Sequence, residues 1–158
     1  MLNWVSIGNH GKDDVNYQVG DLLSDIEAMR LAIAAGRKGV GSVAPNPPVG
    51  CVILNRDRRL VATGFHRKYG GPHAEIEALN QVVDRAQLNG AHVFVTLEPC
   101  AHFGKTPPCA EALAQLPLAR VIFGLEDPNP LVSGKGAERV RSAGITPPSL
   151  IFGPLPLR

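Results

Sequence analysis

Three side chains in this sequence could together bind a metal ion: one histidine, His73, and two cysteines, Cys100 and Cys109. An imidazole and two thiolates form a donor set that suits zinc, and they leave the fourth tetrahedral position free for water. That open position is typical of a catalytic site, whereas a structural zinc site needs a fourth protein ligand. The remaining cysteine, Cys51, lies within an apolar run and is expected to be a packed core thiol. The residue types therefore predict a catalytic zinc centre.

Glu75 follows His73 by two residues and could handle protons beside such a metal. A carboxylate that faces a metal-bound water without ligating the metal can act as a proton shuttle. His73 and Cys109 each follow a proline, which favours the first turn of a helix. We therefore expect both ligands in first turns, where the helix dipole favours a thiolate at Cys109. Cys100 is expected at the end of a strand.

The elements that must position these residues alternate along the chain. Apolar side chains recur at helical spacing from Asp21 to about Lys38, and Ser24 or Asp21 could cap this helix. The continuous apolar run Val49–Leu54 is typical of a strand buried on both faces. A polar turn connects it to a returning strand, and helices and strands then alternate, which predicts an α/β sandwich with a mixed sheet. The later elements are expected as a strand at 60–66, a helix from Pro72 that carries Val82 and Val83, a strand at 91–97, a helix at 107–116, a strand at 120–125, a helix from about 134 to 143 and a candidate edge strand at 149–152.

Length and composition fit a single globular domain. The chain has 158 residues, of which 44% are hydrophobic and 19% charged, so it can bury a core. Residues 1–20 show no periodicity and are expected to form an N-terminal extension to a folded domain at 21–158. The formal net charge of +2 is too small to indicate nucleic-acid binding by itself.

The number of cysteines and the hydropathy pattern indicate the cellular compartment in which the protein works. Three cysteines are an odd number, which argues against a disulfide framework. No apolar stretch approaches the roughly 20 residues that a membrane-spanning helix requires. Nothing at the N-terminus has the pattern of an export signal. We therefore expect a protein of a reducing compartment, the cytoplasm.

Four motifs give the sequence a family resemblance. His73-Ala74-Glu75 precedes the segment Val95–Cys109, in which eight residues separate the two cysteines. The other motifs are Pro45–Gly50 and Asp127–Gly136. Taken in their order along the chain, these motifs resemble the deaminase domain of the bifunctional riboflavin-biosynthesis deaminase/reductase family. That family belongs to the zinc-dependent cytidine/deoxycytidylate deaminase superfamily. The resemblance spans about residues 25–145 and includes no reductase domain.

The resemblance implies a cytidine-deaminase-like fold, a three-layer α/β/α sandwich around a mixed sheet of about five strands. It implies hydrolytic deamination of 2,5-diamino-6-ribosylamino-4(3H)-pyrimidinone 5′-phosphate to 5-amino-6-ribosylaminouracil 5′-phosphate and ammonia. Zn2+ would activate a water, and Glu75 would shuttle its proton. The family's zinc ligands correspond to His73, Cys100 and Cys109, and its substrate contacts to Asn46 for the base, His66, His102 and Lys105 for the phosphate, and Asp127 and Asn129 for the ribosyl part.

Some of these contacts have a plainer interpretation. His102 and Lys105 could belong to an ordinary solvated loop, although they lie between two of the expected metal ligands. Asp127 and Asn129 could equally serve a turn, because Asp-Pro-Asn-Pro is a favourable turn sequence in any protein.

Other functions share part of this pattern. A deaminase of nucleosides or nucleic-acid bases, or a paralogue acting on another aminated pyrimidine or purine, would use the same metal chemistry. The long spacing between the cysteines and the modest charge favour a small phosphorylated substrate instead. A non-catalytic zinc-stabilised module would have a closed metal site. The expected partners are a phosphorylated aminopyrimidine, a second copy in a homo-oligomer and a reductase on a separate chain, without nucleic acid or membrane.

Overall fold

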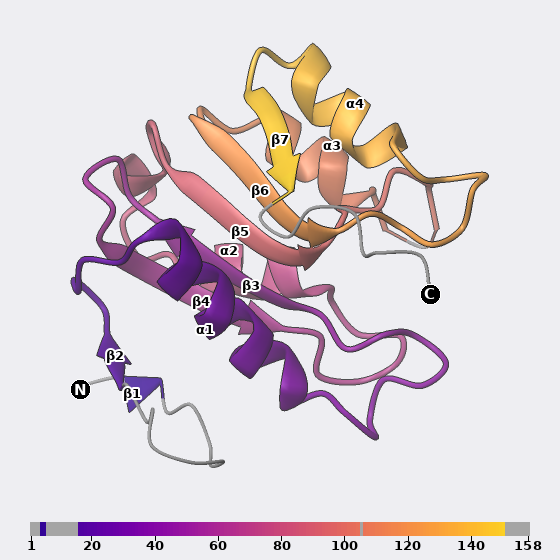
Figure 1. Ribbon diagram of the computed structural model, residues 1–158, viewed down its shortest axis with the longest axis horizontal. Helices are drawn as coiled ribbons and strands as arrows, with labels where there is room; N and C mark the ends of the chain where they lie inside the picture. Colours follow the sequence, from indigo (N-terminus) through magenta and orange to yellow (C-terminus); the bar gives the residue numbers. More distant parts are fainter. Residues whose placement is uncertain (1–3, 6–15, 105, 151–158) are drawn as a thin grey trace.

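A computed structural model describes residues 4–5, 16–104 and 106–150 of the chain (Figure 1). The elements follow one another in an order close to the one expected. They are β1 (Trp4–Val5), β2 (Tyr17–Gln18), α1 (Asp25–Arg37), β3 (Gly50–Leu54), β4 (Leu60–Phe65), α2 (Ala74–Gln81), the 3-10 helix η1 (Arg85–Leu88), β5 (His92–Leu97), α3 (Cys109–Ala114), β6 (Arg120–Leu125), α4 (Lys135–Ser142) and β7 (Thr146–Leu150).

The main sheet is mixed and has five strands in the order β4-β3-β5-β6-β7. β3 pairs antiparallel with both β4 and β5, whereas β6 runs parallel to β5 and to β7. The parallel pairs require crossovers, and α3 and α4 provide them, as Figure 1 shows. β7 is the expected edge strand, but it begins at Thr146, before the expected start at residue 149.

Helices cover both faces of this sheet, which gives the three layers that were expected (Figure 1). Successive residues of β5 point to opposite faces of the sheet, because Val93 belongs to the apolar core on one face and Phe94 to the core on the other. The core containing Val93 is formed with α2, α3 and α4, and it includes the fully buried Cys51, as predicted. The core containing Phe94 is formed with α1, for example through Leu31. All five residues of β3 are buried, so this strand is covered on both faces, as its apolar run predicts.

Ser24 is the N-cap of α1. Its hydroxyl accepts a hydrogen bond from the Glu27 amide, and the Glu27 carboxylate accepts one from the Ser24 amide, so the two residues form a capping box. The other candidate cap, Asp21, instead accepts a hydrogen bond from the Gln18 amide. The helix therefore begins at Asp25, four residues after the start of the expected apolar pattern.

Helix α2 lies very close to β4, and a glycine makes this possible. A Cβ atom built on Gly64 would lie 2.3 Å from the Ala78 nitrogen and 2.5 Å from the Ala74 oxygen. The first turn of α2, which follows His73 and contains Glu75, is thereby held against the sheet. The helix ends at Gln81, so the expectation that it carries Val82 and Val83 is wrong: Val82 is its C-cap and Val83 is 99% exposed.

The segment before residue 21 contacts the domain where the structure describes it. The Gly20 amide donates to the Leu60 carbonyl oxygen at 2.8 Å, and Tyr17 packs against the core on the α1 side. β2 pairs with β1 in a small separate sheet, which the lack of periodicity did not predict. Among the described residues, no helix is both long and apolar enough to cross a membrane.

Candidate metal centre and active site

One edge of the main sheet gathers the chemistry-bearing residues. β5 and β6 are parallel and end at Leu97 and Leu125, which pair with each other. β3 is antiparallel to β5, so its beginning lies at the same edge, as does the end of β4. The loops before β3 and after β4, β5 and β6 therefore meet at this edge. These loops and the first turns of α2 and α3 carry all of the described site candidates: Asn46, His66, His73, Glu75, Cys100, His102, Cys109, Asp127 and Asn129.

The three expected metal ligands come from different elements of this edge. His73 is the N-cap of α2, with extended backbone, so it lies just before the first turn in which it was expected. Its side chain makes no capping hydrogen bond and is free to point elsewhere. Cys100 lies in the loop after β5, and Cys109 is the first residue of α3, as the prolines before it predict.

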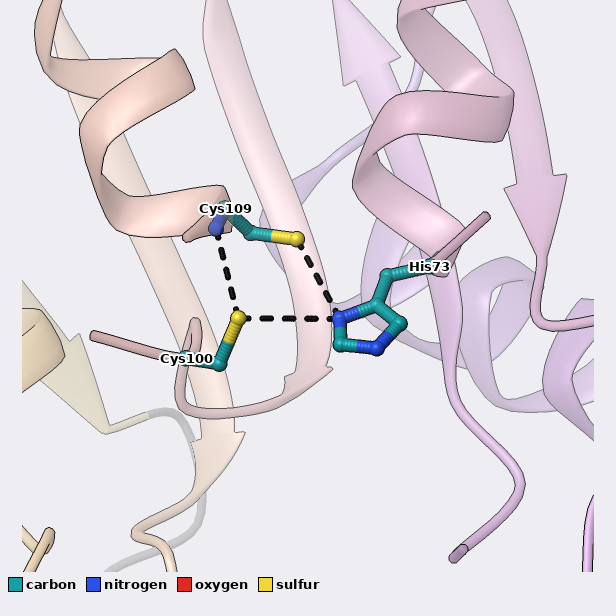
Figure 2. A group of neighbouring side chains, drawn as sticks. All are labelled: His73, Cys100 and Cys109. Carbon is teal, nitrogen blue, oxygen red and sulfur yellow. Dashed lines mark hydrogen bonds between the residues drawn. The ribbon is translucent and has the colours of Figure 1, made fainter. Parts of the chain in front are cut away.

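The side chains of these residues converge on one point (Figure 2). The His73 Nδ1 atom lies 3.6 Å from the Cys100 Sγ atom and 3.4 Å from the Cys109 Sγ atom. All three ligand atoms lie within 4.8 Å of one another. A tetrahedral zinc ion bonds nitrogen at about 2.0 Å and sulfur at about 2.3 Å, which separates its ligand atoms by about 3.5 to 3.8 Å. The donor types and their spacing therefore fit zinc.

The two thiols are electrostatically unequal. A hydrogen bond with the Cys109 thiol, together with His73, lowers the pKa of Cys100 to about 4. The same interaction with Cys100, together with burial, raises the pKa of Cys109. The amide of Cys109 also donates to the Cys100 sulfur at 3.3 Å, which favours the thiolate. The site thus stabilises negative charge on Cys100, and that is the form of cysteine that binds metal.

Glu75 lies in the first turn of α2 and is only 4% exposed. Burial raises the pKa of Glu75 to about 7, and the nearby Cys100 adds to the shift. A carboxyl group in this range can both accept and donate a proton at neutral pH, which a proton shuttle must do. Glu75 follows His73, the N-cap of α2, by two residues, so the helix turn that carries it begins at the candidate metal site.

Asn46 and His66 lie together beside the cluster. The Asn46 Nδ2 and His66 Nε2 atoms are 3.4 Å apart, and the His66 Nδ1 atom lies 2.9 Å from the Pro72 carbonyl oxygen. His66 is only 3% exposed. A carbonyl oxygen only accepts, so Nδ1 carries the proton and Nε2 accepts from the Asn46 amide. A phosphate that reached Nε2 of His66 would have to replace this hydrogen bond.

The remaining expected substrate contacts lie in two loops. His102 is exposed in the loop between Cys100 and Cys109, and Lys105 of the same loop lies outside the described residues. Asp127 is half-buried and Asn129 is exposed in the connection from β6 to α4. The Asp127 Oδ1 atom accepts from the Asn129 amide, so the turn chemistry weighed for this sequence is present.

One buried carboxylate at this edge was not expected from the sequence. Glu98, which directly precedes Pro99-Cys100, is only 4% exposed. An ionisable residue that directly follows a buried strand and stands two residues before an expected metal ligand is the signal that could have identified it.

The chain matches the family model described as "Cytidine and deoxycytidylate deaminase zinc-binding region" over residues 23–125. It is 48% identical over 118 residues to a diaminohydroxyphosphoribosylamino-pyrimidine deaminase of Buchnera aphidicola. The aligned region covers 75% of this chain and 78% of that protein. The chain is 47% identical over 121 residues to the riboflavin biosynthesis protein RibD of Aquifex aeolicus, covering 77% of this chain.

The chain spans 33% of the length of the Aquifex aeolicus protein, and similar shares of several other curated relatives. Among solved structures, RibD of Acinetobacter baumannii matches with a TM-score of 0.70 and 51% identity over 75% of this chain and 32% of that chain. Fold, candidate metal site and sequence thus agree, and the chain belongs to the cytidine and deoxycytidylate deaminase zinc-binding family.

Proposed function

We propose that this chain hydrolyses the 2-amino group of 2,5-diamino-6-ribosylamino-4(3H)-pyrimidinone 5′-phosphate, which yields the corresponding uracil and ammonia. The observation that carries this proposal is the pairing of an open His/Cys/Cys cluster with the buried Glu75 beside it. The 48% identity to a relative named for this activity supports the choice of substrate.

We propose His73, Cys100 and Cys109 as the zinc ligands, since their three donor atoms leave the fourth position of a tetrahedral ion to solvent. A bound zinc ion supplies positive charge that makes water acidic, with a pKa of about 7. The cluster itself favours the thiolate that binding requires, as the low pKa of Cys100 shows. Thiols in this role must stay reduced, which supports a cytoplasmic location.

Glu75 is the proposed proton carrier. It accepts a proton from the attacking water, passes it to a ring nitrogen of the pyrimidine, and finally delivers a proton to the leaving amine. The carbon–nitrogen bond breaks, a carbon–oxygen bond forms, and one water is consumed for each ammonia released. Because burial raises the pKa of Glu75 to about 7, the carboxyl group can take part in both directions near neutral pH.

Six residues are proposed to contact the substrate. Asn46 would recognise the base, and its place beside His66 orients its amide at the rim of the cluster. Lysine and histidine side chains offer charge-assisted hydrogen bonds to a phosphate. Asp127 and Asn129 would contact the ribosyl part from the β6–α4 connection. The proposed phosphate contacts are His66, His102 and Lys105.

The test is ammonia release from the diaminopyrimidine ribosyl phosphate by the zinc-loaded chain, compared with Glu75→Gln. Loss of a general acid–base catalyst costs roughly 100-fold to 10,000-fold in rate, so the variant should retain zinc and lose nearly all turnover. Glu77→Gln is the matched control, because Glu77 lies on the same helix and pairs with Arg67 instead. No ammonia from a folded, zinc-loaded chain would refute the substrate, and full activity of Glu75→Gln would refute the proton carrier.

A further inference from the structure

Glu98 occupies an unusual position for a charged side chain. It is 4% exposed and lies two residues before the proposed zinc ligand Cys100. Its own amide donates to the Leu125 carbonyl oxygen at 2.8 Å, so its backbone is tied to the end of β6. A buried carboxylate is costly unless hydrogen bonds compensate for the lost water.

Three backbone amides supply that compensation. The Oε2 atom of Glu98 accepts from the amides of Asp127 and Gly134, both at 3.1 Å, and Oε1 accepts from the Ala137 amide at 3.2 Å. Hydrogen bonds to an ionised carboxylate are stronger than those between neutral groups. One side chain thus binds both ends of the connection between β6 and α4.

The carboxylate also replaces a missing helix cap. The N-cap of α4 is Gly134, whose φ of 82° suits glycine and which has no side chain to accept from the first-turn amides. Glu98 accepts from the Ala137 amide, one of those that a serine or aspartate N-cap would bind. Close packing completes the contact, because a Cβ atom on Gly136 would lie 1.9 Å from the Pro99 carbonyl oxygen.

The connection that Glu98 binds contains Asp127 and Asn129, two of the proposed substrate contacts. Their side chains shape the loop internally, since Asp127 Oδ1 accepts from the Asn129 amide and Asn129 Oδ1 accepts from the Leu131 amide. These local bonds do not determine where the loop lies relative to the metal cluster. The hydrogen bonds to Glu98 connect the loop to that site, because the same residue is covalently connected through Pro99 to Cys100.

We propose that Glu98 is a positioning residue for the substrate: its carboxylate holds the Asp127–Gly134 loop in a fixed position relative to the segment that carries Cys100. This inference rests on the proposed function, since it assigns the loop to the same substrate as the metal cluster. The side-chain hydrogen bonds of Glu98 go to these backbone amides and not to the proposed metal ligands. Glu98 acts by fixing the distance between two parts of one binding site.

Glu98→Gln is the test, because glutamine keeps the shape but offers one acceptor oxygen to three amides. Three measurements are compared with the wild-type chain: bound zinc, hydrogen exchange at the amides of Asp127, Gly134 and Ala137, and steady-state kinetics. We expect unchanged zinc content, faster exchange at these amides, and a KM raised by about tenfold with a kcat changed by less than about threefold. Glu126→Gln, at an exposed residue of the same connection, is the control and should leave all three unchanged.

The outcomes separate this inference from the proposed function. Unchanged exchange at the three amides would overturn the inference, and so would faster exchange with an unaltered KM, because Glu98 would then only cap α4. If the wild-type chain releases no ammonia, the proposed function fails. In that case the role of Glu98 is tested by hydrogen exchange at the three amides in the zinc-bound Glu98→Gln chain. Exchange as slow as in the wild-type chain would overturn that role.

Discussion

The imidazole rings of His66 and His73 lie edge to face, with centroids 5.4 Å apart and planes at 79°. His66 is itself held in place, since its Nδ1 atom donates to the carbonyl oxygen of Pro72, the residue directly before His73. One buried side chain therefore fixes both the backbone and the ring of the proposed zinc ligand. It also connects that ligand to Asn46, whose amide reaches the other ring nitrogen.

Replacing His66 should weaken zinc binding. An edge-to-face aromatic pair contributes about 0.5 to 1.5 kcal/mol, so we expect His66→Ala to lower zinc affinity by up to about tenfold. Competition with a chromogenic chelator measures this change. His66→Phe is the matched variant, because it keeps the ring contact but loses both hydrogen bonds, and it should retain most of the affinity. Equal zinc affinity in the alanine variant and the wild-type chain would contradict the prediction.

Zinc should protect Cys100 from alkylation. When zinc is removed with a chelator, Cys100 should react with iodoacetamide, because its pKa is lowered to about 4, whereas the buried Cys109, whose pKa is raised, should react much more slowly. Cys51 is fully buried in the core, and burial raises its pKa, so it should stay unmodified in both states. Mass spectrometry of the labelled peptides distinguishes the three sites. Rapid labelling of Cys51 in folded protein would show that this arrangement is wrong.

Acid should weaken an ion-pair network at Asp25. Although burial opposes the shift, hydrogen bonds from Arg120 and Arg58 hold the pKa of Asp25 below its usual value. Its contribution is therefore complete above the unfolded-state pKa of about 3.9 and is lost as the pH falls through the lower folded-state pKa. With the Asp25 and Arg120 side chains 37% and 29% exposed, solvent screening limits the contribution to about 1 kcal/mol.

Urea unfolding at pH 7 and pH 3 measures this effect. Asp25→Asn should lose stability relative to the wild-type chain at pH 7, and the difference should shrink at pH 3. Asp57→Asn, at an exposed position of the β3–β4 turn, is the control and should change stability little at either pH. A constant difference between the Asp25 variant and the wild-type chain at both pH values would exclude the ionic explanation.

Gly64→Ala should destabilise the domain and disturb the metal site. The added methyl would lie 2.3 Å from the backbone nitrogen of Ala78, and backbone cannot move aside as a flexible side chain could. Overpacking of this kind costs about 1 to 3 kcal/mol, and here it would push α2, whose N-cap is His73, away from the sheet. Thermal unfolding and zinc content are the measurements. Gly104→Ala, where a Cβ atom meets nothing within 4 Å, should unfold at the wild-type temperature.

The sequence alone determined the chemistry of the site and most of the secondary structure. A histidine and two cysteines are a zinc donor set wherever they meet, and this required only residue types and spacing. The apolar run Val49–Leu54 indicated a strand buried on both faces, because no polar side chain interrupts it, and β3 is buried at all five of its residues. These inferences depend on local composition, which the chain carries in any conformation.

Tertiary structure decided which groups meet. In the folded chain Ser24 and not Asp21 is the N-cap of α1, and α2 ends at Gln81, before Val82 and Val83. Tertiary structure also placed the carboxylate of Glu98 on amides up to 39 residues away. Nothing in the local sequence specifies such a partner, since any buried carboxylate needs donors but only the folded sheet edge determines which amides lie within reach.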